Sequence, residues 1–159
     1  DSFTRYQETT QVLVLVDGKL IQKEDHFVDK WDEVKLVETS RYLHDCAKRG
    51  GIVLGAFDGD ICIGFTAVLP GRFGSRHQYA EMTLCHVDQH YRGFGIGRAL
   101  FQRTCRIAKA RGIEKLYLST HPSVETQGFY RSVGCVQARE INPAILAREP
   151  LDIQLEKHL

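Results

Sequence analysis

The sequence predicts an α/β (α+β) fold with a mixed, mostly antiparallel central sheet and helices on both faces. Asp-Gly pairs at 17–18 and 58–59 each separate two apolar runs, and this dipeptide between such runs is typical of a β-hairpin. The second half then alternates strand-like and helix-like segments, as expected for a sheet covered by helices. The 159 residues contain no repeat, linker or low-complexity segment, so we expect one domain over residues 1–159.

The expected elements follow in order along the chain. The first hairpin is expected within residues 10–22, and a helix within 31–48, where apolar residues recur at roughly helical spacing before two glycines. The second hairpin takes up residues 52–69. The later elements follow from the same periodicities: a strand over 78–87, a helix from the glycine-rich turn to about 111, a strand over 114–120, a short helix over 123–133 and a last strand over 151–159.

The composition indicates an ordinary globular protein, with 43% hydrophobic and 26% charged residues. The 21 lysines and arginines nearly balance the 20 acidic residues, so no strong overall field predicts a nucleic-acid or membrane partner. No apolar run approaches the ~20 residues that span a bilayer, and no signal peptide is visible. Five cysteines without a C-x-x-C pair predict reduced thiols in a cytoplasmic protein. The start at Asp1 rather than methionine is what an incomplete N-terminus would give.

The stretch YRGFGIG at residues 91–97 places three glycines where a strand becomes a helix. Glycine leaves backbone N–H groups open to a ligand, and a helix N-terminus adds unpaired N–H groups and a positive dipole end. Such a turn is typical of a phosphate or pyrophosphate site, to which Arg92 and Arg98 would add charge-assisted hydrogen bonds. The dinucleotide fingerprint would need glycine instead of Arg98, and no Walker loop is present. A glycine-rich turn without function is the alternative.

The run from Arg92 to Gly97 resembles the acyl-CoA pyrophosphate loop of the GNAT N-acyltransferase superfamily. Its surroundings are similar too: Val87 ends a strand before the loop, KLYLST follows the helix, and GFYRSVGC at 128–135 precedes the last strand. The resemblance covers roughly residues 52–140 and implies a GNAT fold, acetyl-CoA as cosubstrate and no metal. The chain departs from the family in its opening, where the usual first strand and helix are hard to see.

The resemblance also implies which residues contact the cosubstrate. Ser123 stands about where many members have an asparagine that contacts it, so that contact is open here. The implied binding residues are Cys85, His86, Val87, Arg92, Gly93, Phe94, Gly95, Ile96, Gly97, Arg98, Ser123 and Phe129.

Acetyl transfer to an amine requires that the amine lose a proton, that the tetrahedral oxyanion be stabilised and that the leaving thiolate be protonated. Glu81 is the candidate base, because it lies six residues before the strand end and AEMTLCHV resembles the strand that carries a base glutamate in protein-lysine acetyltransferases. Unless a bulge intervenes, strand alternation puts four residues on one face: Glu81, Thr83, Cys85 and Val87. The alternative is an ordinary carboxylate paired with Arg72 or Arg76.

Tyr130 is the candidate acid, since a phenol with a pKa of ~10 can donate to a departing thiolate. Its place in GFYRSVG matches the family tyrosine that lies near the cosubstrate's sulfur; a buried core tyrosine is the alternative. His86 and His90 are spaced i, i+4, but a strand-to-turn location does not bring them to one metal ion. His121 is either a secondary base or a hydrogen-bonded histidine, and Cys85 is read as a small buried residue rather than a nucleophile.

Charge is divided unevenly along the chain. Residues 92–115 hold seven lysines and arginines against one acid, which suits the phosphates of coenzyme A. Residues 24–38 hold six acids against two lysines, either as a solvated surface or as a region that attracts a cationic amine. We therefore expect acetylation of a small cationic amine by direct attack in a ternary complex. Protein lysine or N-terminal acetylation and a non-catalytic acyl-CoA sensor are the alternatives, and a homodimer is compatible with the resemblance.

Overall fold

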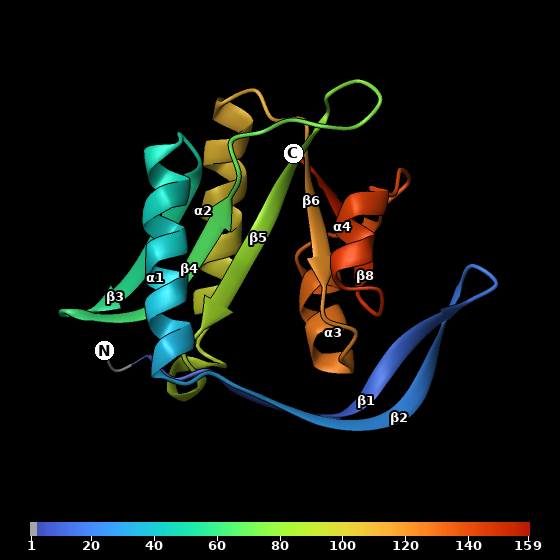
Figure 1. Cartoon of the computed structure of the whole chain (residues 1–159), viewed down its shortest axis with the longest axis horizontal. Helices are drawn as coiled ribbons and strands as arrows, with labels where there is room; N and C mark the ends of the chain where they lie inside the picture. The colour runs from blue at the N-terminus through green and yellow to red at the C-terminus, as the bar shows by residue number, and fades with distance from the viewer. Residues whose placement is uncertain (1–2) are drawn as a thin grey trace.

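The computed structural model describes residues 3–159, which form one six-stranded sheet, a separate two-stranded hairpin and four α-helices (Figure 1). The six strands lie in the order β3-β4-β5-β6-β8-β7, and each neighbouring pair is antiparallel except β5–β6. This confirms the predicted mixed, mostly antiparallel sheet. The strands are β3 (Ile52–Asp58), β4 (Ile61–Val68), β5 (Tyr79–Val87), β6 (Lys115–Thr120), β7 (Val136–Gln137) and β8 (Ile153–His158).

Helices cover both faces of the sheet. In Figure 1, α1 lies in front of the strands and α2 behind them, and both contact β3 and β4. Asp32 and Ser123 cap α1 and α3 by accepting the backbone N–H three residues on, which satisfies one of the free donors at each helix start. The helices are α1 (Glu33–Lys48), α2 (Ile96–Ala110), α3 (Val124–Ser132) and α4 (Pro143–Arg148), with a short 3₁₀ turn at Gln89–Tyr91.

The core lies mainly between the sheet and α2. Phe101 and Ala108 of α2 pack with Leu116 and Leu118 of β6 and with Val68 of β4, and all five are at most 1% exposed. Burial of these side chains is the main favourable contribution to folding. The glycine turn that opens α2 is thereby fixed against the sheet.

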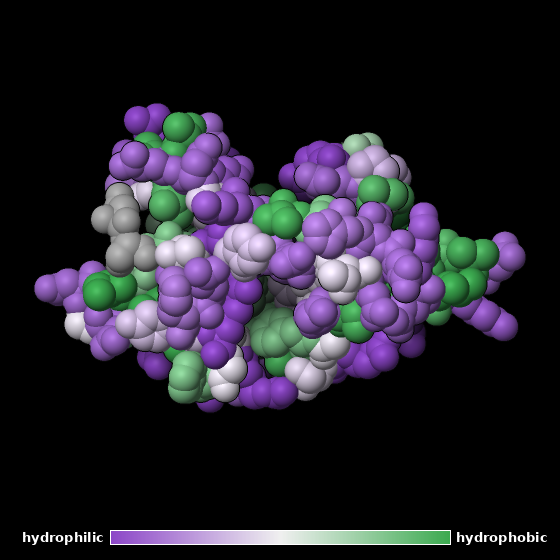
Figure 2. All heavy atoms as spheres, turned by 90° about the horizontal axis from the view of Figure 1, so that it is seen from below, coloured by the Kyte–Doolittle hydropathy of each residue, from purple (hydrophilic) through white to green (hydrophobic). Residues whose placement is uncertain are grey.

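The first hairpin is longer than the sequence predicted. β1 (Tyr6–Val16) and β2 (Lys19–Lys30) turn at residues 17 and 18, which have φ of 48° and 76° as a two-residue hairpin loop requires. The prediction of 10–22 stopped early because the stretch QKEDH in β2 is polar and exposed on both faces and carries no alternation. The hairpin extends away from the sheet (Figure 1, blue), and its tip forms the apolar cluster at the right-hand end of Figure 2, where Leu15, Val16 and Ile21 are exposed.

Two later elements were not predicted. α4 has six residues, too few to show a helical period, although Asn142 before Pro143 is a typical helix start. β7 has two residues and pairs only with β8. The remaining predicted strands and helices are confirmed, and their ends differ from the predicted ones by at most two residues.

The pairing of β5 with β6 is short. Parallel pairs join Tyr79 to Lys115, Ala80 to Leu116 and Glu81 to Tyr117 and then stop. Beyond them the two strands diverge, leaving an opening at the lower end of the sheet (Figure 1). A pair of parallel strands that separate in this way leaves backbone N–H and C=O groups free for another partner.

A bulge in β5 corrects the expected alternation. Ala67 pairs with Leu84 but the next residue, Val68, pairs with Met82, so Thr83 is an extra residue in β5. The alternation of side chains between the two faces of the sheet therefore shifts by one residue at the bulge. Glu81 lies on the opposite face from Cys85 and Val87, so the bulge is the stated exception, and the shared face expected for Glu81, Thr83, Cys85 and Val87 in a regular strand does not form.

No helix among residues 3–159 has the length and apolar content needed to cross a membrane. The five cysteines are free thiols, two of them buried.

Close packing at Gly51 generates the first prediction. A Cβ on Gly51 would collide with Cys46 Sγ and lie 2.7 Å from Val68 O, whereas a Cβ on Gly71 would meet nothing within 4 Å. Neither glycine has a positive φ. Gly51→Ala should lower the free energy of unfolding by about 1–3 kcal/mol, and Gly71→Ala should change it by less than about 0.5 kcal/mol. Chemical denaturation measures both, and equal stability of the two variants would contradict the packing described.

Candidate active site

Two clefts meet where β5 and β6 separate. The first, of about 700 Å³, lies beside the glycine turn and is called here the glycine-turn cleft. The second, of about 550 Å³, lies between α1 and α4 and is called the α1–α4 cleft. Thr83 of β5 and Ser119 of β6 line both. Seen from below, this end of the molecule is mostly hydrophilic and is hollowed between two lobes (Figure 2).

Most of the predicted binding residues gather in the glycine-turn cleft. Tyr130 lines it as well. Phe94 is 78% exposed, Ser123 is fully buried, and neither lines this cleft. The residues that do line it are Cys85, His86, Val87, Arg92, Gly93, Gly95, Ile96, Gly97, Arg98 and Phe129.

The glycine turn is shaped by backbone geometry. Gly93 and Gly95 have φ of +83° and +81°, which side-chain-bearing residues rarely adopt. Gly95 is the N-cap of α2 and supplies no side-chain cap, so the first N–H groups of the helix have no intrahelical partner. A Cβ on Gly97 would lie 3.4 Å from Phe129 and Val87. The turn thus presents free N–H groups and a positive helix end to the cleft.

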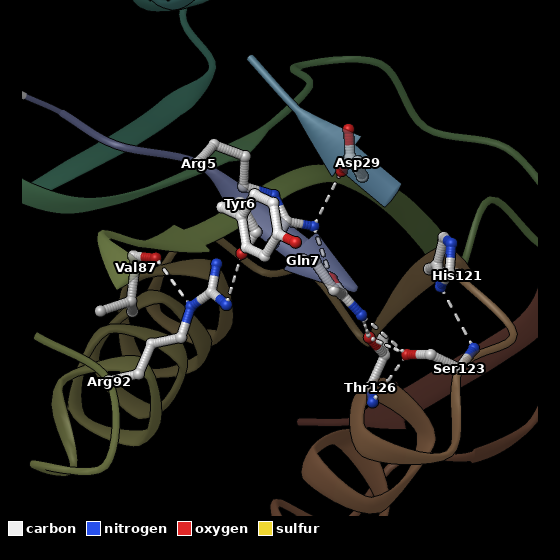
Figure 3. A network of polar contacts seen from close by, with 9 residues as sticks. All are labelled: Arg5, Tyr6, Gln7, Asp29, Val87, Arg92, His121, Ser123 and Thr126. Atoms are coloured by element: carbon white, nitrogen blue, oxygen red, sulfur yellow. Dashed lines mark hydrogen bonds and ion pairs between the residues drawn. The ribbon is translucent and has the colours of Figure 1, made fainter. Parts of the chain in front are cut away.

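Arg92 lies at the side of the cleft near β1. Its Nε donates to Val87 O at 3.3 Å and its guanidinium donates to Tyr6 O at 2.8 Å (Figure 3). Both acceptors are neutral carbonyls, so the charge of Arg92 has no ion-pair partner among the described residues. Arg98, also exposed, donates instead to the main chain and hydroxyl of Ser132.

Arg5 is a cleft residue that the sequence analysis missed. It is 9% exposed and pairs with Asp29 at 3.1 Å, while it also donates to Gln7 Oε1 at 2.7 Å (Figure 3). Its Nε is buried without a hydrogen-bond partner. Burial lowers the pKa of Arg5 and neighbouring Arg92 lowers it further, with Asp29 acting in the opposite direction. No motif surrounds Arg5, so only the path of β1 could reveal its role.

The residues around the start of β1 lie between the ends of β5 and β6 and are hydrogen-bonded to the segments that follow both strands. On one side, Thr4 N–H donates to Asp88 Oδ2 at 2.6 Å and Thr4 O accepts from Gln89 N–H at 3.1 Å. On the other, Gln7 Nε2 donates to Ser123 Oγ at 2.9 Å (Figure 3). Ser123 Oγ also caps α3, which means that its hydroxyl is occupied within the protein.

Tyr130 and Cys85 lie together in the cleft wall, close enough that each side chain affects the pKa of the other. Burial, and next the Cys85 thiol, raise the pKa of Tyr130 well above its ordinary value. Burial raises the pKa of Cys85 to about 12. Tyr130 therefore stays protonated as a hydrogen-bond donor, and Cys85 stays a thiol rather than a thiolate nucleophile.

The cleft histidines are neutral. Burial lowers the pKa of His86 to about 3, with Arg5 adding to the effect, and the ring packs edge-on against Trp31 at 4.9 Å. Burial also lowers the pKa of His121, whose Nδ1 accepts from Ser123 N–H at 3.1 Å. That bond puts the ring proton on Nε2. Within residues 3–159, no group of three His, Cys, Asp or Glu side chains is arranged to hold a metal ion.

Glu81 lies in the α1–α4 cleft and not in the glycine-turn cleft. It is 8% exposed and accepts from the Arg148 guanidinium at 2.5 Å. The suggested alternative partners were wrong, because Arg72 donates to a main-chain carbonyl and Arg76 pairs with Glu114. In the sheet, Glu81 pairs with Tyr117, and this is the last pair of residues before β5 and β6 separate.

Comparisons with known proteins agree with this geometry. Residues 20–135 match the family model described as the acetyltransferase (GNAT) family. No curated protein sequence matches the chain.

Three solved structures share the fold. A Bacillus anthracis str. Ames protein assigned to streptothricin acetyltransferase, in complex with acetyl coenzyme A, has a TM-score of 0.72 and 18% identity, over 100% of this chain and 92% of that one. Nourseothricin acetyltransferase has a TM-score of 0.69 and 17% identity, over 98% and 87%. Ribosomal-protein-alanine N-acetyltransferase from Brucella melitensis has a TM-score of 0.60 and 21% identity, over 78% of each chain.

The neutral state of His86 predicts how stability depends on pH. The folded pKa of about 3 lies below the unfolded value of 6.5, so below pH 6.5 only the unfolded chain takes up the proton. His86 should therefore reduce the free energy of unfolding by about 1.4 kcal/mol between pH 7.5 and 5.5. In His86→Gln this loss should disappear, whereas the control His44→Gln, at an exposed position, should retain it. Urea titrations at the two pH values decide, and an unchanged loss in His86→Gln would contradict the buried neutral state.

Proposed function

Because the chain belongs to the acetyltransferase (GNAT) family, we propose that it transfers an acetyl group from acetyl-CoA to a primary amine of a small cationic molecule. As a member of this family it is an acetyl-CoA-dependent acyltransferase. The proposal concerns its acceptor and the residues that act on it.

The observation that carries the proposal is the meeting of two clefts at Thr83 and Ser119. A cosubstrate in the glycine-turn cleft and an acceptor in the α1–α4 cleft could reach each other there from opposite faces of the sheet. In a ternary complex the amine attacks the thioester directly, without an acyl-enzyme intermediate. Both ligands must therefore be bound at the same time with their reacting groups next to each other. The protonated thiol of Cys85 supports the same conclusion.

The glycine-turn cleft fits a polyanionic cosubstrate. Arg5 has a buried Nε without a partner and Arg92 has no ion pair, and both lie with the free N–H groups of the glycine turn. We assign the pyrophosphate of coenzyme A to these groups, since charge-assisted bonds and a helix start favour it. The end of β5 at Cys85, His86 and Val87 pairs with β4 but has no strand partner on its β6 side, and we assign the pantetheine arm to that edge.

Glu81 and Tyr130 are the proposed acid–base pair. Glu81 accepts the proton that the ammonium group loses, directly or through water, while Arg148 compensates its charge. Tyr130, which burial keeps protonated, donates to the thiolate that leaves as the amide forms. The two groups lie on opposite sides of the junction between the clefts.

The small cationic acceptor is supported by the matches that span nearly the whole chain. The streptothricin and nourseothricin acetyltransferase structures include the long N-terminal hairpin within 100% and 98% coverage. The ribosomal-protein-alanine N-acetyltransferase covers 78%. The similarity of this chain to that enzyme keeps protein acetylation as the second candidate. The strand that carries Glu81 also favours it, because its sequence resembles that of protein-lysine acetyltransferases.

Acetyl-CoA should raise the melting temperature, whereas NAD and ATP should not. At 100 times the dissociation constant a ligand adds about 2.7 kcal/mol, or roughly 5–10 °C at this chain length.

Arg5→Gln and Arg92→Gln should each weaken acetyl-CoA binding about 10- to 100-fold through the lost charged hydrogen bonds. The control Arg106→Gln, at an exposed position on α2, should leave it unchanged. Calorimetric titration measures the affinities, and equal values for all three variants would remove the phosphate assignment.

Tyr130→Phe should lower kcat at least about 100-fold, because the thiolate would leave without its proton donor. The KM for acetyl-CoA should change little. The assay follows thiol release with a panel of streptothricin, spermidine, lysine and a peptide. Release with the peptide alone would favour the second candidate. No release with any acceptor, despite tight acetyl-CoA binding, would indicate a sensor instead of an enzyme.

A further inference from the structure

The α1–α4 cleft contains more negative than positive side chains. Four carboxylates and two cations line it. Arg148 pairs with Glu81 at 2.5 Å, and Lys35 lies 4.0 Å from Glu38. The two carboxylates left over are Glu149 and Asp152, neither of which has an ion pair among the described residues. Glu149 is exposed and Asp152 is partly buried, so the uncompensated charge that matters most is that of Asp152.

Asp152 is held beside the junction of the two clefts. Its Oδ2 accepts from Ser119 Oγ at 2.9 Å, and Ser119 Oγ in turn accepts from Gln154 Nε2 at 2.9 Å. Ser119 lines both clefts, whereas Asp152 lines only the α1–α4 cleft. Through this bond, the carboxylate is fixed next to the place where an acceptor would meet a thioester.

The surroundings of Asp152 leave its charge unsatisfied. Burial raises the pKa of Asp152, the nearby Glu149 carboxylate acts in the same direction, and only the Ser119 hydroxyl opposes them. A cation at this carboxylate would restore the lost stabilisation. Trp31 and Tyr42 line the same cleft, and aromatic faces of this kind attract ammonium groups and pack against alkyl chains.

We propose that Asp152 is the counter-ion of the acceptor's primary ammonium group, which it binds beside Ser119 at the junction of the clefts. The inference rests on the proposed function and names the feature of the acceptor that the site recognises: a primary alkylammonium group on a short chain. Ser119 is a positioning residue, because it acts by orienting the Asp152 carboxylate. Glu81 retains the separate role of accepting a proton.

The test measures amine binding apart from turnover. Protein saturated with coenzyme A is titrated calorimetrically with spermidine and with streptothricin, for the wild type, Asp152→Asn and Asp60→Asn. Asparagine at 152 keeps the shape and can still accept from Ser119, but lacks the charge. Asp60 lies exposed in the turn between β3 and β4, so Asp60→Asn changes the net charge equally at a distant site. The melting-temperature rise with acetyl-CoA verifies that each variant is folded.

Asp152→Asn should weaken binding of at least one amine about 10- to 100-fold, and Asp60→Asn should change it less than threefold. Equal affinity in the two variants, or no amine binding by the wild type, would overturn the inference. If amine binding depends on Asp152 but the wild type acetylates no amine, the proposed function fails and the ammonium site stands. If the wild type acetylates amines with the same KM in Asp152→Asn, the inference fails and the function stands.

Discussion

The pairing of β5 with β6 stops after three residue pairs, and the geometry of the active site depends on where it stops. Up to Glu81 and Tyr117 the two strands share hydrogen bonds and a core with α2. Past that point they diverge, and both clefts reach the opening through Thr83 and Ser119. A fully paired sheet would separate its two faces completely. Under the proposed function, the open wedge would allow two ligands bound on different faces to come into contact.

The bulge at Thr83 divides the roles of the residues on β5. Without it, Glu81 would face the same side as Cys85 and the glycine turn. With it, Glu81 faces the α1–α4 cleft, where Arg148 pairs with it. A proton acceptor and a thiol-side donor can thus lie on the two sides of one junction, which is the arrangement that amine attack on a thioester needs.

The parts of the site that depend on local chain geometry could be predicted from the sequence. The glycine turn carries its own signal, because only glycine relaxes at positive φ and the helix follows directly. Side-chain direction in β5 could not be predicted, since a one-residue bulge leaves no mark in the apolar pattern. Arg5 and Asp152 could not be predicted either, because Arg5 pairs with Asp29 and Asp152 with Ser119, both distant along the chain, and no motif surrounds Arg5 or Asp152. Their importance comes from groups that the fold encloses without full compensation: Arg5 Nε has no hydrogen-bond partner, and the partly buried Asp152 carboxylate has no ion pair among the described residues.

The two clefts carry uncompensated charges of opposite sign. In the glycine-turn cleft, Arg92 lacks an ion pair and Arg5 keeps an unbonded buried Nε; in the α1–α4 cleft, Asp152 and Glu149 lack cations. Two of these groups are unfavourable for folding: the buried Arg5 Nε, which has no hydrogen-bond partner, and the partly buried Asp152 carboxylate, which has no cation. Their separation into two neighbouring clefts instead favours an anion on one side and a cation on the other. Under the proposed function each ligand would supply the missing charge, so the groups that lack a partner within the protein are those proposed to select its two substrates.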